Sequence, residues 1–176
     1  MKIRVTKGIG HGPTELSAFD QALNIAGIAN FNLIYLSSVL PPGSIVERQE
    51  VATPFPGGWG DRLYIVIAQM RTIQRNQEVW AGIGWMQDPK TKAGLLVEHE
   101  GHNEGEVRAD IENSLKALAE NRKMKFGPIH MEVVGAKCED EPVCALVIAA
   151  FESHPWKANA NQNVNVLRRL TKFNKK

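Results

Sequence analysis

The sequence predicts an α/β fold in which helices cover β-sheets in layers. Roughly six or seven short apolar segments are typical of strands, and two longer segments carry apolar residues at helical spacing. The 176 residues suit a single domain, and a hydrophobic content of 43% is sufficient for a sizeable core. These observations predict a globular protein rather than a fibrous or disordered one.

The amino-terminal part predicts a strand, a turn and a helix. Residues 2–6 alternate polar and apolar side chains, as a half-buried strand does. Residues 8–13 are rich in glycine and are interpreted as a loop; they lack the lysine of a phosphate-binding P-loop. Thr14 can cap the following helix, and Gly27 is a suitable end signal. We expect its buried face to consist of Leu16, Phe19, Leu23 and Ala26.

The next segment is an apolar run that ends in two serines and two prolines. Residues 33–40 are expected to form one short buried strand, which Pro41 and Pro42 end because they lack an N–H. Ser37 and Ser38 therefore lie at the end of this strand. Such a pair is common in turns, but it also has a possible chemistry. The second hydroxyl can attack the carbonyl carbon before it, and β-elimination from the resulting ester leads to a pyruvoyl group.

The remainder of the chain predicts further strands and a second helix. A loop rich in proline and glycine covers residues 53–60. Asn103 is expected to cap the second helix, with Glu106 three residues later. The buried positions of that helix are expected to be Val107, Ile111, Leu115 and Leu118. The expected strands are residues 63–70, 79–86, 94–97, 129–134 and 143–151.

Three blocks of sequence carry a resemblance to a known family. They are residues 30–42, which include Ser-Ser-Val-Leu-Pro-Pro, residues 16–28, and the segment 94–101, Gly-Leu-Leu-Val-Glu-His-Glu-Gly. Their order and approximate spacing resemble the pyruvoyl-dependent arginine decarboxylases, and the resemblance covers most of residues 1–151. We therefore expect a decarboxylase domain at 1–151, cut into a small chain 1–37 and a large chain 38–176. Residues 152–176 are expected to be a basic extension with a short amphipathic helix.

The resemblance implies both an architecture and an activity. The implied fold is a four-layer αββα sandwich, self-cleaved into two chains, whose subunits form a homotrimer or a dimer of trimers with active sites between neighbours. The implied reaction is decarboxylation of L-arginine to agmatine and carbon dioxide. The covalent pyruvoyl cofactor made from Ser38 would form a Schiff base with the α-amino group of the substrate.

The same resemblance assigns roles to individual residues. Ser37 and Ser38 are the processing site, and Asn32 is expected to polarise the Ser37 carbonyl. Asp20 is expected to pair with the substrate guanidinium, because a carboxylate accepts two parallel hydrogen bonds from it. Leu16 is expected to line the same pocket. We further expect the helix that carries Asp20 to lie against the strand that carries Ser38.

Glu98 corresponds to the proton donor that acts after decarboxylation. We expect it to be buried, because burial disfavours the charged carboxylate and keeps its proton in place. On this view Glu98→Gln should leave processing largely intact. Glu100 is the rival for this role, since residues two apart face the same side of a strand.

Composition restricts the other possibilities. The net charge of +2 favours neither nucleic acid nor a membrane surface as a partner, and no apolar run is long enough to span a membrane. Cys138 and Cys144 are too few for a disulfide framework and indicate a reducing compartment, the cytoplasm. His99 and His102 lack the spacing of a zinc-protease motif, so no metal is expected. Two alternatives remain: a pyruvoyl decarboxylase for another amino acid, and an uncleaved, non-catalytic subunit or binding module.

Overall fold

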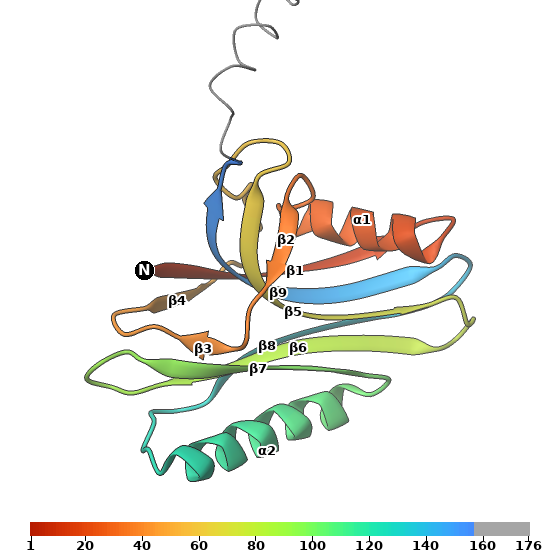
Figure 1. The fold of residues 1–176 in the computed structure, drawn as a ribbon. Helices are drawn as coiled ribbons and strands as arrows, with labels where there is room; N and C mark the ends of the chain where they lie inside the picture. The colour runs from red at the N-terminus through yellow and green to blue at the C-terminus, as the bar shows by residue number, and fades with distance from the viewer. Residues whose placement is uncertain (157–176) are drawn as a thin grey trace, which may run out of the picture.

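Two β-sheets stack face to face between two helices in the computed structural model, which describes residues 1–156 (Figure 1). Helix α1 (Glu15–Ile25) covers one sheet and helix α2 (Glu104–Arg122) covers the other. The expected four-layer αββα sandwich is therefore confirmed. The strands are β1 (Lys2–His11), β2 (Asn32–Tyr35), β3 (Val39–Leu40), β4 (Ile45–Arg48), β5 (Arg62–Thr72), β6 (Glu78–Gln87), β7 (Gly94–Gly101), β8 (His130–Lys137) and β9 (Val143–His154).

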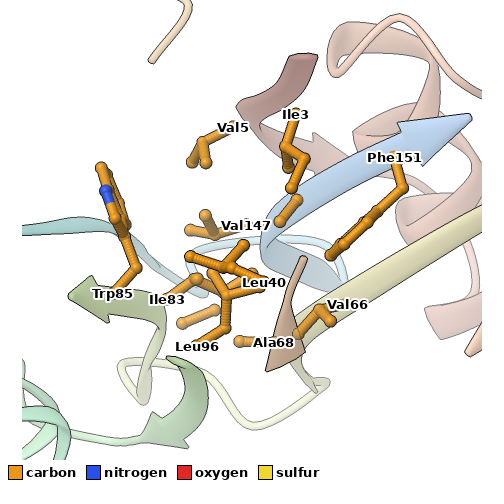
Figure 2. Packing of buried hydrophobic residues seen from close by; sticks show 12 residues of the cluster. Ile3, Val5, Leu40, Val66, Ala68, Ile83, Trp85, Leu96, Val147 and Phe151 are labelled. Carbon is orange, nitrogen blue, oxygen red and sulfur yellow. The ribbon is translucent and has the colours of Figure 1, made fainter. Parts of the chain in front are cut away.

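The larger sheet, which we call sheet A, has the strand order β2-β5-β9-β1-β4, and sheet B has the order β3-β7-β6-β8. Side chains from both sheets meet in the central core, where Leu40 of β3 and Leu96 of β7 lie opposite Val66 of sheet A (Figure 2). Two further cores hold the helices, one between α1 and sheet A and one between α2 and sheet B. The two hydrophobic faces of each sheet explain why its strands are rich in apolar residues.

The glycine-rich segment 8–13, expected to be a loop, continues strand β1 as far as His11. Its glycines permit the close approach of α1: a Cβ at Gly8 would overlap the backbone of Ala22, and one at Gly10 would overlap the carbonyl oxygen of Ala18. The absence of side chains at these positions thus reflects helix–strand packing, not a turn.

Helix α1 has the expected ends, and three of its four expected core positions are confirmed: Leu23 and Ala26 are buried and Phe19 packs partly buried beside them. The Thr14 side chain accepts a hydrogen bond from Ser17 N–H, and Gly27 follows the helix with a φ of 79°. The buried helical residues are Ala18, Ala22 and Leu23, whereas Leu16 is 70% exposed. The prediction that Leu16 is buried was wrong, because small residues are needed where the helix crosses Gly8 and Gly10.

The segment 33–40 is not one buried strand, and this correction matters most for the site. Its first half, β2, pairs in parallel with β5 at the edge of sheet A, and its second half, β3, pairs antiparallel with β7 at the edge of sheet B. Residues 36–38 cross from one sheet to the other. Ser37 is exposed in this crossing and Ser38 is half-buried.

The remaining predictions differ mainly in their ends. Helix α2 begins after Asn103, which caps it, and buries the expected Val107, Ile111 and Leu115. Strand β4 was not predicted, and β9 continues three residues beyond Phe151. The amphipathic stretch expected near the carboxyl end lies outside the described residues. Within residues 1–156, no helix is both long and apolar enough to cross a membrane.

Candidate active site

The expected processing serine and the expected proton donor lie in contact. Ser38 Oγ donates a hydrogen bond of 2.7 Å to Glu98 Oε2, although 60 positions separate the two residues in the chain. Strand pairing produces this contact: Val39 lies opposite Leu95 and Leu40 opposite Gly94, so Ser38 comes beside the middle of β7. A distance of 2.7 Å is typical of a charge-assisted hydrogen bond to a carboxylate.

Glu98 is held on the face of β7 that points between the sheets. Leu96 belongs to the central core and Val97 to the core beneath α2, so alternation along the strand puts Glu98 on the same face as Leu96. The Glu98 side chain is exposed, contrary to the burial that we expected, because β3 ends the sheet at this point and no segment within residues 1–156 covers it. Glu100 shares this face, but among residues 1–156 it has no hydrogen bond to Ser38.

Two backbone N–H groups bind the carbonyl oxygens of the two serines. Val39 N–H donates to the Ser37 oxygen at 2.7 Å, and Leu96 N–H donates to the Ser38 oxygen at 2.9 Å. Sequence reasoning missed both donors. No side-chain pattern could have indicated them, since they depend on a turn and on strand register rather than on residue type.

An open depression adjoins Ser38 along the free edge of β7. It is lined by Ser38, Leu96, Val97, Glu98, His99, Ser114, Ala117 and Leu118. Within this lining, His99 Nε2 lies 2.8 Å from Ser114 Oγ of α2. The depression therefore combines four apolar side chains with two hydrogen-bonded polar pairs, Ser38–Glu98 and His99–Ser114.

Asp20 and Leu16 lie in a different layer from Ser38. Both are exposed on α1, which packs on the outer face of sheet A, whereas Ser38 is joined to sheet B. The expectation that α1 lies against the strand carrying Ser38 was wrong, because sheet A separates them. Among the described residues Asp20 has no ion pair or hydrogen-bonded side-chain partner.

Asn32 also lies apart from the Ser37 carbonyl within the chain. Its side-chain amide donates a 2.6 Å hydrogen bond to Gly60 O, at the start of β2. Ser37 follows the end of that four-residue strand, and about 3.3 Å per residue puts the two well out of contact. Inside one chain, the donor to Ser37 O is Val39 N–H instead.

The two described residues whose pKa is clearly shifted, Cys144 and Asp88, lie outside this site. Burial raises the pKa of the Cys144 thiol to about 11, despite the opposing effect of Arg71, but Cys144 lies under α1. Backbone and side-chain hydrogen bonds from Thr91 lower the pKa of Asp88, which shapes a hairpin loop. In residues 1–156 no cluster of three or more histidine, cysteine or acidic side chains could hold a metal ion.

Three curated proteins with similar sequences share one description. The curated pyruvoyl-dependent arginine decarboxylase of Picrophilus torridus is 35% identical over 113 residues, covering 61% of this chain and 59% of that protein. That of Thermoplasma volcanium is 36% identical over 107 residues, covering 60% and 58%. The alignments thus span less than two thirds of these two relatives. That of Methanocella arvoryzae is 33% identical over 158 residues, covering 85% and 92%.

A solved structure, "Structure of pyruvoyl-dependent histidine decarboxylase at pH 8", aligns with 61% of this chain and 57% of its own, at 16% identity and a TM-score of 0.43. A family model described as pyruvoyl-dependent arginine decarboxylase matches residues 2–154, which include both sheets and both helices. The chain therefore belongs to the pyruvoyl-dependent arginine decarboxylase family.

Proposed function

We propose that the chain cleaves itself between Ser37 and Ser38 and then decarboxylates L-arginine to agmatine and carbon dioxide. The observation that carries this proposal is the 2.7 Å hydrogen bond from Ser38 Oγ to Glu98 Oε2. Family membership supplies the reaction class, and the contact joins the nucleophile of processing to a carboxylate that can accept its proton.

The residues present fit a pyruvoyl group derived from Ser38. Ser37 is exposed at the edge of the sandwich, so the two new chain ends can move apart there without opening either sheet. Leu40, two residues after Ser38, is fully buried in the central core and fixes the new end of the large chain. When formed, the group supplies a ketone that reacts with an amine and accepts electrons.

We assign Glu98 two tasks at one position. In the uncleaved chain it accepts the proton of Ser38 Oγ, which makes that oxygen a nucleophile. In the cleaved enzyme the same carboxyl group holds a proton beside the position of Ser38 and delivers it to the product. The contact thus changes the expectation that Glu98→Gln leaves processing intact.

We propose that the substrate site forms between neighbouring subunits of a homotrimer. Within one chain, sheet A lies between Asp20 on α1 and Ser38 beside sheet B. Since neighbouring layers are about 10 Å apart, two layer spacings separate these residues by on the order of 20 Å. The three-methylene side chain of arginine is too short to bridge that gap. An exposed Asp20 of one subunit can instead meet Ser38 at the sandwich edge of another, where Leu16 would line the pocket.

The assignment of Asn32 follows the same geometry. Its exposed position at the start of β2 makes it available to a neighbouring subunit rather than to Ser37 of its own chain. We also place the enzyme in a reducing cytoplasm, because both cysteines are free and buried, as unpaired thiols in that compartment usually are.

Intact mass and a substrate assay test the proposal directly. Purified protein should separate, when denatured, into residues 1–37 and a large chain that begins at the former Ser38, and it should release carbon dioxide from arginine. Ser38→Ala should remain full length because it lacks the attacking oxygen. A wild-type chain that stays intact after long incubation would favour a non-catalytic subunit, and preference for lysine, ornithine or histidine would favour another decarboxylase.

Co-expression tests the shared site. Asp20→Asn and Ser38→Ala are each expected to be nearly inactive at low arginine concentration. Mixed oligomers should regain activity, because an intact Asp20 from one variant meets an intact Ser38 from the other. Mixtures that stay as inactive as the separate variants would mean that both residues act within one chain.

A further inference from the structure

The carbonyl oxygens on both sides of the Ser38 side chain are bound by backbone N–H groups. Val39 N–H lies 2.7 Å from the Ser37 oxygen, and Leu96 N–H lies 2.9 Å from the Ser38 oxygen. Both distances fall within the 2.7–3.1 Å range expected of donors that stabilise an oxyanion. We propose that these two amides are the oxyanion-stabilising groups of self-cleavage and that each acts in a different step. This inference rests on the proposed self-cleavage.

The Val39 donor is available because of its place in the strand ladder. In an antiparallel pair, residues alternate between positions whose N–H groups face the partner and positions whose N–H groups face away. Leu96 N–H binds Ser38 O, so Ser38 faces β7 and Val39, the next residue, faces away from it. Val39 N–H therefore turns back to Ser37 O and closes a three-residue γ-turn centred on Ser38.

The conformation of this turn is the relaxed one. Outside glycine, positive φ angles among the described residues occur only at Asn76, Lys92 and Lys123. Ser38 thus has a negative φ, which makes this an inverse γ-turn, a form that is common at strand ends. The donor is fixed before the reaction begins, so no reorganisation is needed when charge develops.

The first step uses the Val39 amide. Ser38 Oγ gives its proton to Glu98 and forms a bond to the Ser37 carbonyl carbon, whose oxygen becomes negatively charged and is stabilised by Val39 N–H. The bond from that carbon to the Ser38 nitrogen then breaks, and the nitrogen receives the proton from Glu98. The amide has become an ester, and Glu98 is again a free carboxylate.

The second step uses the Leu96 amide. Removal of the Ser38 Cα proton by Glu98 places negative charge on the Ser38 oxygen, which Leu96 N–H stabilises. The electron pair then forms the Cα–Cβ double bond, the Cβ–Oγ bond breaks, and Ser37 leaves as a carboxylate. Water subsequently replaces the nitrogen, which departs as ammonia.

Backbone esters test the two roles separately. Incorporation of the α-hydroxy analogue of valine at 39, or of leucine at 96, removes one N–H while keeping the side chain. The ester at 39 should slow cleavage roughly a hundredfold, the usual scale for one oxyanion donor. An ester at this position also makes the Ser38 α-proton more acidic, which speeds elimination, so slower cleavage can only come from the acyl shift.

The ester at 96 should instead cause the Ser37–Ser38 ester intermediate to accumulate. Hydroxylamine cuts that full-length intermediate at residue 37, and mass spectrometry identifies the fragments. The matched control is an ester at Gly94, whose N–H is the next one along β7 that faces β3 in this register. This ester should leave cleavage unchanged. Thermal unfolding of each variant monitors the loss of its backbone hydrogen bond.

The outcomes separate this inference from the proposed function. Normal cleavage by the ester variants at 39 and 96, beside normal cleavage by the unmodified chain, would overturn the inference while leaving self-cleavage intact. Equal slowing by the Gly94 ester would also overturn it, since lost strand pairing would then explain the effect. An unmodified chain that never cleaves would overturn the proposed self-cleavage itself.

Discussion

Replacement of Glu98 by glutamine separates proton transfer from positioning at the cleavage site. Glutamine has nearly the same shape and can still accept the hydrogen bond from Ser38 Oγ, now 2.7 Å long to a carboxylate oxygen. It cannot accept the proton. Losing a general base typically costs a factor of 10² to 10⁴, so we expect self-cleavage of Glu98→Gln to slow roughly a hundredfold or more.

The measurement is a time course of intact mass after rapid purification of the freshly made chain. Glu100→Gln is the matched control: it lies two residues along the same face of β7, is also exposed, and removes the same charge. It should cleave at the wild-type rate. Wild-type cleavage by Glu98→Gln would refute its role as the base of processing, and slow cleavage by Glu100→Gln alone would transfer that role to Glu100.

Decarboxylation by Glu98→Gln can be measured on whatever fraction has been cleaved. Since the carboxyl group is also proposed to deliver a proton to the product, turnover per cleaved chain should fall by a similar factor. Full turnover by the cleaved fraction would confine Glu98 to processing.

Three other predictions concern the substrate, packing and pH. Asp20→Asn should cleave normally but show a Michaelis constant for arginine raised roughly a hundredfold, because a desolvated guanidinium loses its carboxylate; unchanged kinetics would remove Asp20 from the pocket. Gly10→Ala should lower the midpoint of thermal unfolding by several degrees, since its methyl group would overlap the Ala18 carbonyl oxygen. Burial raises the pKa of the Cys144 thiol to about 11 in the folded chain, so as the pH rises this thiol loses its proton in the unfolded chain first. Folding stability should therefore fall between about pH 9 and 11, and less so in Cys144→Ala; a fall of equal size in Cys144→Ala would exclude this thiol as its cause.

The local elements of the fold could be predicted from the sequence because their causes are local. Thr14 and Asn103 cap helices through their own side chains, and apolar alternation marks strands wherever one face is buried. The Ser37–Ser38 pair could be recognised for a related reason, since the hydroxyl and the carbonyl that would react in the proposed cleavage belong to adjacent residues. Family motifs pointed to Glu98 before any contact was known.

Tertiary structure decided how these parts meet. Periodicity could not reveal that residues 33–40 divide between two sheets, because strand pairing depends on partners far away in sequence. It could not tell a loop glycine from Gly10, which leaves room for a helix packed across β1. Nor could periodicity show that sheet A lies between Asp20 and Ser38, or that the N–H groups of Val39 and Leu96 bind the carbonyl oxygens of Ser37 and Ser38. Layer order and strand register fix these relations. Both depend on contacts between segments far apart in the sequence, which the local pattern of residue types does not show.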